Sequence, residues 1–344
     1  MKFMDYRLAD SVSAADEIDY SSPLQDNVLN VTYGVDENYQ FGVAISIVSL
    51  LTNNKDKQFC FHLFLNECQI DYRNKLNSIA KYFNTKIVVY IVSVDFFSKL
   101  PSTKIWSYAM YFRLLAFEYL GQSLKRVLYL DADVFCKGSV DQLVTLDLED
   151  NIAAVVKDLS STLTKSTSKL GQELLSGVEY FNSGVMLVNL SIWRACGLTN
   201  IAIDMLLDPE IGGKVKYPDQ DILNIILNEK VIYLPKKFNC IYSIKNELND
   251  RTHLRYRDII KEDTILIHYT GITKPWHEWA DYPSTKYFYD AFKLSPWDKS
   301  GLKKAISVTE KQKEYKHRLA KKEYVLGLYK AISYNLSKLK NKWF

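Results

Sequence analysis

Short apolar runs alternate with longer segments that end at turn residues over the first 130 residues of the chain. A short apolar run predicts a strand, and the longer segments between the runs predict helices. Strands are expected at residues 28–33, 58–65, 86–92 and 126–130, and helices at 41–51, 71–83 and 107–120. This alternation predicts an α/β fold with a parallel sheet of the kind that binds nucleotides.

The pattern is less regular after residue 133. Further strands are expected at residues 181–189, 231–234 and 264–268, and a short helix at 219–227. Residues 160–169 are rich in Ser and Thr and predict a loop.

The chain shows no internal repeat, so its organisation is predicted from composition alone. Residues 1–25 are polar and predict a poorly ordered lead-in. One α/β domain is expected over residues 26–295, and a basic C-terminal segment over residues 296–344.

This last segment carries a narrow apolar stripe. Six apolar residues recur at spacings of three or four, which places them on one face of a helix, and Lys330, Lys338 and Lys342 lie off that face. A basic amphipathic helix ending in Trp343 and Phe344 indicates an anchor on an anionic inner leaflet. Packing of the stripe against the body of the protein is an equally open alternative. The stripe consists of Val325, Leu328, Ile332, Leu336, Leu339 and Trp343.

The composition is that of a globular protein with a full core, with 47% hydrophobic and 24% charged residues in a chain of 344. No run of about 18 apolar residues occurs, so no membrane-spanning helix is expected. The first 25 residues lack the apolar region of a signal peptide. The five cysteines are scattered without a Cys-x-x-Cys pair, which predicts reduced thiols and a cytoplasmic location.

The net charge of +4 is unevenly distributed along the chain. Residues 301–344 hold 12 Lys or Arg against 3 Glu, whereas the preceding 300 residues carry a net charge of −5. A basic tail on a mildly acidic body predicts attraction to an anionic partner. Nucleic acid is not expected to be that partner, because the body offers no matching basic face in its composition.

Two carboxylates follow directly after the apolar run at residues 126–130. Side chains at positions i and i+2 of an extended segment point the same way, so Asp131 and Asp133 can converge at the carboxyl end of a strand. Their repulsion favours a bound cation, and Mg²⁺ or Mn²⁺ is the natural occupant. Two alternatives stay open: a turn in which Asp133 caps a helix, and the nucleophile loop of a haloacid-dehalogenase-type phosphatase with Asp131 attacking phosphorus.

A second candidate group follows the first predicted strand. Gly34 permits a tight turn, Asp36 and Asn38 could bond the edge of a base, and Tyr39 could stack on it. An ordinary helix cap at Asp36 or Asn38 is the alternative interpretation.

A third group follows the apolar strand at residues 264–268. His268 is a candidate metal ligand, and an imidazole ligand favours Mn²⁺ somewhat over Mg²⁺. Gly271 allows the backbone to approach a phosphate closely, and Lys274 supplies a positive charge. A core histidine followed by an aromatic surface loop is the alternative.

Further polar residues lie in apolar surroundings. Asp219 and Gln220 start a helix whose acidic first turn needs only one aspartate as a cap, which leaves them available for a substrate. Asn182 stands at the head of an apolar strand. Arg113 lies within an aromatic helix, where it must pair with a carboxylate or phosphate or extend to solvent.

Taken together, these segments resemble the family 8 retaining glycosyltransferases, and among them the bacterial hexosyltransferases that extend the lipopolysaccharide outer core. Six short motifs in the family's order make the phosphatase interpretation unlikely, as does the position of Asp131 after the fourth predicted strand rather than the first. The matching stretches are residues 33–42, 106–120, 126–143, 180–193, 217–224 and 267–276.

The resemblance implies a GT-A fold, in which a doubly wound, mainly parallel sheet binds a nucleotide sugar and a smaller portion binds the acceptor. It implies that Asp131, Asp133 and His268 ligate Mn²⁺ or Mg²⁺, and that Asp219 and Gln220 lie at the reacting sugar. Ala132 stands at a position that varies in the family, so its identity does not select the sugar. The implied donor-binding residues are Gly34, Asp36, Asn38, Tyr39, Arg113, Asp131, Ala132, Asn182, His268, Gly271 and Lys274.

The implied reaction is the transfer of a hexose from a UDP-sugar to the lipopolysaccharide outer core with retention of the α configuration. Glucose is expected rather than galactose, from the likeness to the 1,2-glucosyltransferase branch. The implied location is the cytoplasmic face of the inner membrane, with peripheral attachment through the C-terminal helix. A metal-dependent phosphatase and a non-catalytic membrane adaptor are the competing hypotheses.

Overall fold

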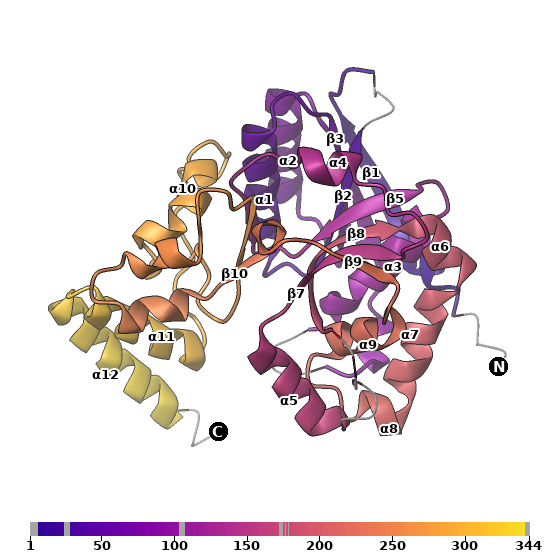
Figure 1. Cartoon of the computed structure of the whole chain (residues 1–344). Helices are drawn as coiled ribbons and strands as arrows, with labels where there is room; N and C mark the ends of the chain where they lie inside the picture. Colours follow the sequence, from indigo (N-terminus) through magenta and orange to yellow (C-terminus); the bar gives the residue numbers. More distant parts are fainter. Residues whose placement is uncertain are drawn as a thin grey trace.

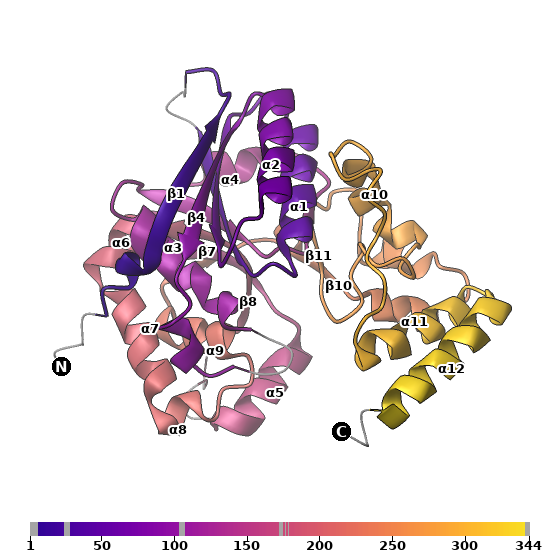
Figure 2. The same ribbon diagram turned by 180° about the vertical axis from the view of Figure 1, so that it is seen from behind.

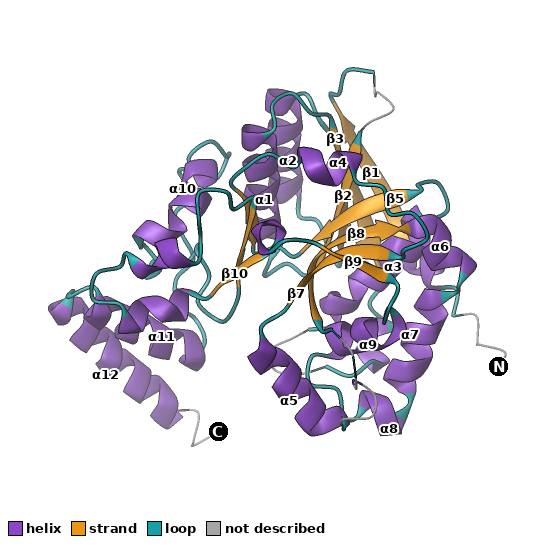
Figure 3. Cartoon of the chain, viewed as in Figure 1, coloured by secondary structure: helices purple, strands orange, loops and turns teal. Residues whose placement is uncertain are grey.

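Figure 1 shows the computed structural model of the chain, in which an α/β body carries a smaller helical portion at one side. Figure 3, coloured by secondary structure, places nearly all strands in the body and only helices and loops at the far C-terminal side. The structure describes residues 6–23, 28–102, 107–171, 175, 177 and 179–340.

The body is built on an eight-stranded sheet with the strand order β1-β4-β3-β2-β5-β8-β7-β9. Strands β4, β3, β2 and β5 run parallel to one another, as do β7 and β9, whereas β1 is antiparallel to β4 and β8 is antiparallel to both β5 and β7. This confirms the predicted α/β fold with a mainly parallel sheet. The strands are β1 (Val12–Asp19), β2 (Leu29–Val35), β3 (Phe59–Leu65), β4 (Lys86–Val92), β5 (Arg126–Leu130), β7 (Ala153–Lys157), β8 (Phe181–Asn189) and β9 (Val231–Tyr233).

Helices cover both faces of this sheet, which explains the apolar character of its central strands. All seven residues of β3 are buried, with Phe61 and Phe59 facing one layer of helices and Phe64 and Cys60 facing the other. Such strands read as continuous apolar runs because neither face meets water. The helices of the body are α1 (Gln40–Asn53), α2 (Ile70–Phe83), α3 (Phe112–Leu120), α4 (Asp141–Thr145), α5 (Ser160–Leu170), α6 (Leu190–Ala195), α7 (Leu198–Leu207), α8 (Pro209–Gly212) and α9 (Pro218–Ile226).

A second, three-stranded sheet joins the body to the C-terminal portion. It consists of β10 (Cys240–Tyr242), β11 (Leu266–Tyr269) and β6 (Val134–Cys136), in the order β10-β11-β6. Strand β11 is antiparallel to β6, and its register sets His268 opposite Val134. This pairing brings His268 next to Asp133, which precedes it by more than a hundred residues. Of the three strands in this sheet, the sequence predicted only β11.

Two expectations from the sequence are wrong in detail. Residues 12–19, expected within a poorly ordered lead-in, form β1, which pairs antiparallel with β4 at the edge of the sheet (Figure 2). Only Ile18 of this strand is buried, so its apolar signal is weak. Residues 160–169, expected as a loop, form α5. The hydroxyls of Thr164 and Thr167 donate to carbonyls four residues earlier, so these side chains do not compete with the helix.

The C-terminal portion consists of α10 (Lys286–Phe292), α11 (Val308–Ala320) and α12 (Tyr324–Lys340). A capping box between Ser307 and Glu310 starts α11, and α11 and α12 pack together as a helical hairpin. The predicted C-terminal amphipathic helix is present as α12, although Lys342, Trp343 and Phe344 lie outside the described residues. None of the helices in the described part of the chain combines the length and the apolar character that a membrane crossing requires.

Gly42 sets how closely α1 approaches the turn after β5. A Cβ atom at Gly42 would lie 2.6 Å from the carbonyl oxygen of Ala132 and 2.7 Å from Cζ3 of Trp276. Real Cβ atoms do not come this close to other atoms, so only glycine fits without a shift of backbone or ring.

We expect Gly42→Ala to lower the free energy of unfolding by about 1–3 kcal/mol, because the added methyl overpacks this contact. Urea unfolding followed by tryptophan fluorescence measures the change. Gly138→Ala is the matched control, since its Cβ would meet no atom closer than 3.5 Å, and its stability should stay within about 0.5 kcal/mol of the original. Equal stability of the two variants would contradict the packing argument.

Candidate active site

A cavity of about 500 Å³ opens where the carboxyl ends of β2, β5 and β11 meet the amino end of β8. Strand β8 runs antiparallel to β5, so its first residues lie at the same edge as the last residues of β5. The two sheets therefore deliver polar residues from distant parts of the chain to one place. The predicted site residues that line the cavity are Gly34, Asp36, Tyr39, Arg113, Asp131, Ala132, Asp133, Asn182, Asp219, Gln220, His268, Gly271 and Lys274.

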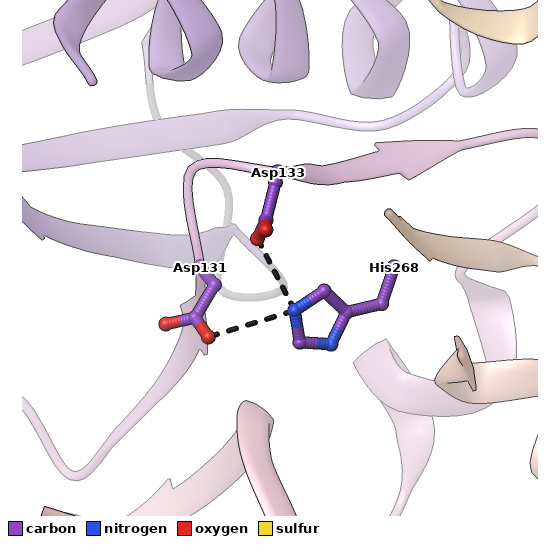
Figure 4. A group of neighbouring side chains, drawn as sticks. All are labelled: Asp131, Asp133 and His268. Carbon is purple, nitrogen blue, oxygen red and sulfur yellow. Dashed lines mark ion pairs between the residues drawn. The ribbon is translucent and has the colours of Figure 1, made fainter. Parts of the chain in front are cut away.

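Asp131, Asp133 and His268 converge at this edge, as Figure 4 shows. Nε2 of His268 lies 3.1 Å from Oδ1 of Asp133 and 3.7 Å from Oδ2 of Asp131. One ligand atom from each residue falls within 4.8 Å of the other two. Adjacent ligands of an octahedral Mg²⁺ or Mn²⁺ ion are roughly 3 Å apart. Two carboxylates and an imidazole at these distances fit such an ion, with positions left for substrate oxygens.

Gly184 in β8 leaves the space in which these ligands meet. A Cβ atom there would lie 2.4 Å from Cε1 of His268 and 2.7 Å from Oδ2 of Asp131. Any larger residue would push the imidazole and the carboxylate apart. The fit of the three ligands thus depends on a residue that is not itself a ligand.

Arg113 holds Asp131 from the other side. This side chain is 3% exposed, and its Nη2 donates to Oδ1 of Asp131 at 2.8 Å, while Tyr129 donates to the same oxygen at 3.0 Å. Its Nη1 donates to the carbonyl of Ser183 at 2.7 Å, and its Nε lies 3.2 Å from Oδ2 of Asp219. The predicted pairing of this buried arginine with a carboxylate is confirmed twice. Oδ2 of Asp131 is left facing His268.

Burial and charge act against each other in this cluster. Burial alone would lower the pKa of Arg113, but Asp219 and Asp131 outweigh it and raise that pKa above its ordinary value. Burial raises the pKa of Asp219, although Arg113 opposes this. For His268, burial acts to lower the pKa, and the charge of Asp133 together with the hydrogen bond to it raises the pKa overall.

Lys274 compensates the second carboxylate. Its Nζ contacts Oδ2 of Asp133 and donates to the carbonyl of Tyr269 at 3.1 Å. Burial would raise the pKa of Asp133, but the charges of Lys274 and His268 lower it below its ordinary range. Gly271, with φ of 94°, adopts the left-handed conformation that lets this loop turn beside the cavity.

The loop after β2 forms another wall of the cavity. Asp36 accepts a hydrogen bond from the hydroxyl of Ser107 at 2.6 Å and another from the backbone N–H of Asn38 at 3.0 Å. Tyr39 lies edge-on to Trp276, with 6.0 Å between ring centroids. Asn38 departs from the prediction, because it is exposed, it does not line the cavity, and its carbonyl accepts a hydrogen bond from Lys303.

The first turn of α9 confirms that one aspartate serves the local structure. Both carboxylate oxygens of Asp221 are used, by the backbone N–H groups of Lys216 and Tyr217 and by the hydroxyl of Tyr180. Asp219 and Gln220 instead line the cavity.

Several residues at the cavity were missed by sequence reasoning. Asp158 accepts from Nε2 of Gln220 at 2.9 Å and from Nδ2 of Asn182 at 3.2 Å, and Thr162 and Lys165 of α5 lie beside it on the wall. Asp158 follows the apolar run of β7, which is the same signal that identified Asp131. It went unnoticed because no strand was predicted there.

An open, mainly parallel sheet with helices on both faces, an Asp-x-Asp pair at its carboxyl edge and a histidine brought there by the second sheet is typical of a nucleotide-binding α/β enzyme. The chain belongs to glycosyl transferase family 8. The sequence model of that family matches residues 30–280, and the model of the family's C-terminal region matches residues 282–338. This membership contradicts the phosphatase hypothesis for Asp131.

Curated relatives cover nearly the whole chain. It is 44% identical to a lipopolysaccharide 1,2-glucosyltransferase of Escherichia coli over 90% of this chain and 91% of the relative. It is 37% identical to a lipopolysaccharide 1,3-galactosyltransferase of Salmonella typhimurium over 94% of this chain and 95% of the relative. Among solved structures, it is similar to the galactosyltransferase LgtC in complex with donor and acceptor sugar analogues, with 25% identity, a TM-score of 0.65 and coverage of 78% of this chain and 99% of LgtC.

We expect Gly184→Ala to weaken the binding of Mn²⁺ at least about tenfold, because the methyl group separates His268 from Asp131. Titration of free Mn²⁺ by electron paramagnetic resonance measures the affinity directly. Thermal unfolding of the same sample shows whether the variant is folded. A folded variant with unchanged affinity would show that these residues do not bind the cation as a set.

Proposed function

We propose that this protein transfers a hexose, glucose rather than galactose, from a UDP-sugar to the outer-core oligosaccharide of lipopolysaccharide. Transfer retains the α configuration and depends on Mn²⁺ or Mg²⁺. The observation that carries the proposal is the 44% identity to a lipopolysaccharide 1,2-glucosyltransferase over nine-tenths of the chain. The convergence of Asp131, Asp133, His268 and Lys274 in one cavity supports an active enzyme over a non-catalytic adaptor.

The choice of glucose rests on two comparisons. Identity to the 1,2-glucosyltransferase is 44%, whereas identity to the 1,3-galactosyltransferase is 37% over a similar share of the chain. A further relative, the lipopolysaccharide glucosyltransferase WaaO of Escherichia coli, is 36% identical. The higher identity to the glucosyltransferase supports glucose as the donor.

The roles proposed for single residues come from the resemblance to the family, and the place of these residues on the cavity wall supports them. Asp36 and Tyr39 would hold the uridine, and Gly271 and Lys274 the diphosphate. Asn182, Asp219 and Gln220 would face the transferred sugar, and Arg113 would help hold the donor and the carboxylates beside it. Thirteen of the fourteen predicted site residues line the cavity, and Asn38 would act only through the backbone of its loop.

Breaking the anomeric C–O bond builds negative charge on the β-phosphate, and this charge must be neutralised for the bond to break. A cation held by Asp131, Asp133 and His268 would act there as a Lewis acid. The buried ammonium group of Lys274 adds a positive charge that stays in place, because burial and Asp133 hold it on the cavity wall.

Retention can follow a double displacement or a front-side attack. Double displacement requires a free nucleophile on the face of the sugar opposite the leaving group. Asp219 is paired with Arg113, and Oε1 of Gln220 accepts from the N–H of Ser183 at 3.1 Å. These engagements support front-side attack, in which the departing phosphate takes the proton of the acceptor hydroxyl.

The test is incubation of the protein with UDP-glucose or UDP-galactose, Mn²⁺ and lipopolysaccharide truncated before the outer core. We expect transfer of glucose with release of UDP, and at least about a 100-fold loss of kcat in Asp131→Asn, because the amide is a poor cation ligand and cannot pair with Arg113. Mass spectrometry of the product and circular dichroism of the variant are the readouts. Transfer of galactose alone would overturn the donor choice, and an active, cation-independent Asp131→Asn would overturn the role of the site.

The outer-core acceptor is anchored in a membrane, so we further propose that the protein binds the cytoplasmic face of the inner membrane through α12. This helix presents its apolar side outward. Val325, Leu328, Ile332, Leu336 and Leu339 are 56 to 87% exposed. These residues of the stripe therefore do not pack against the body of the protein, which was the alternative prediction.

The opposite side of α12 faces α11 with small and polar groups. A Cβ at Gly327 would meet Leu319, Lys330 pairs with Glu314 at 2.9 Å, and Ser337 accepts from Lys311 at 2.9 Å. A helix in water buries its apolar side, so the reverse arrangement supports a lipid surface as the covering partner. The basic C-terminal segment suits anionic headgroups.

We expect the double variant Ile332→Ser, Leu336→Ser to bind phosphatidylglycerol vesicles at least about tenfold more weakly, since two apolar side chains no longer enter the interface. Sedimentation with vesicles measures binding. Ile70→Ser, at an apolar residue of α2 that is 70% exposed, is the control and should bind normally. Normal sedimentation of the α12 variant would contradict attachment through this face.

A further inference from the structure

Asn239 is a buried amide that touches both the cation site and the sugar wall. It precedes β10, is 2% exposed and does not line the cavity. Its Oδ1 lies 3.1 Å from Nδ1 of His268, and its Nδ2 lies 2.9 Å from Oδ1 of Asn182. We propose that Asn239 is a positioning residue that fixes the tautomer of His268 and the orientation of Asn182 together. The inference rests on the proposed function, because it concerns the cation site of that reaction.

The direction of these hydrogen bonds follows from one unambiguous donor. The backbone N–H of Gly184 can only donate, and it donates to Oδ1 of Asn182 at 3.0 Å. Since Oδ1 of Asn182 is therefore the oxygen, the atom of Asn239 that approaches it must be the amide nitrogen. The oxygen of Asn239 then faces His268.

This orientation of the Asn239 amide determines which nitrogen of the His268 imidazole carries the hydrogen. An oxygen at 3.1 Å from Nδ1 of His268 requires that nitrogen to carry a hydrogen. In the neutral ring the lone pair is then on Nε2, the atom that lies beside Asp131 and Asp133. A ligating histidine commonly has its other nitrogen hydrogen-bonded in this way, which sets the tautomer and the plane of the ring. The other tautomer would point an N–H at the cation.

The amide of Asn239 also orients the side chains that are proposed to face the sugar. With its oxygen engaged by Gly184 and Asn239, Asn182 turns Nδ2 toward Oδ2 of Asp158 at 3.2 Å and Oε1 of Gln220 at 3.1 Å. The hydrogen bond from Asn182 in turn determines which atom of the Gln220 amide is the oxygen. Asn239 therefore links the histidine of the cation site to the residues proposed to face the sugar, through a chain of hydrogen bonds between mostly buried groups.

The two hydrogen bonds of Asn239 can be tested separately by two different substitutions at this position. Asn239→Leu keeps the branched shape of the side chain and removes both hydrogen bonds. Asn239→Asp keeps an oxygen for the N–H of His268 and removes the donor to Asn182. We expect Asn239→Leu to bind Mn²⁺ about 10–100-fold more weakly, as found when a partner of a ligating histidine is lost. We expect Asn239→Asp to bind Mn²⁺ within about threefold of the original protein, with a higher KM for the sugar donor.

Asn54→Leu is the matched control. Asn54 is also 2% exposed, and its amide donates to the carbonyl of Leu50 at 3.0 Å and accepts from the N–H of Val140 at 2.9 Å. It touches none of the proposed cation ligands. We expect this variant to lose stability and to keep its Mn²⁺ affinity, which distinguishes the loss of a buried amide from the loss of the link to His268.

Mn²⁺ affinity is measured without donor, by electron paramagnetic resonance of the free ion, beside donor KM and thermal unfolding. Unchanged affinity in Asn239→Leu, or equal weakening in both Asn239 variants, would overturn the proposal. If the original protein does not bind Mn²⁺, the cation site and the proposed function fail first.

The tautomer can also be read from the original protein, so the proposal does not depend on whether Asn239→Leu folds. Nitrogen-15 spectra of the histidine rings with Mg²⁺ bound should show the hydrogen of His268 on Nδ1. Assignment uses His268→Gln as the spectrum that lacks this ring. A hydrogen on Nε2 would overturn the inference.

Discussion

The repulsion between the carboxylates of Asp131 and Asp133 is the constraint on which the rest of the site depends. Two negative charges at one buried sheet edge are unfavourable unless each is compensated. Arg113 compensates the first and Lys274 the second, while His268 stands between them. One oxygen of each carboxylate is thereby engaged by a cationic side chain, and the others face the position in which a divalent ion fits.

This arrangement requires both sheets at once. The main sheet brings Asp131 to its edge next to the first residues of β8, and β11 brings His268 against β6. Glycines at 42 and 184 let the layers approach closely enough for these groups to meet. Close backbone packing and charge compensation therefore act together at this site.

The C-terminal hairpin is also bonded to the loop that follows β11. Oγ1 of Thr273 lies 3.2 Å from Nε2 of His317 in α11. Lys274, on the same loop, reaches into the cavity. Helix α11, on which α12 packs, thus contacts the loop that forms one wall of the candidate active site.

Local sequence signals were sufficient for the strands of the main sheet from β2 to β5, and for the residues at their ends. The rule that side chains at i and i+2 point the same way placed Asp131 and Asp133 together, and an apolar strand before His268 placed it at a sheet edge. The pairing of Arg113 was predicted as well, because a guanidinium group that is buried requires a carboxylate or a phosphate as its partner.

What the sequence alone determined was therefore the set of elements and the chemistry at their ends, since both depend on neighbouring residues. Only the tertiary structure decided that β1 joins the sheet, that residues 160–170 form a helix, that Asn239 touches His268, and that α12 turns its apolar side outward. The places of β1 and of Asn239 depend on partners far away in the chain, and the identity of such a partner is not contained in any local pattern.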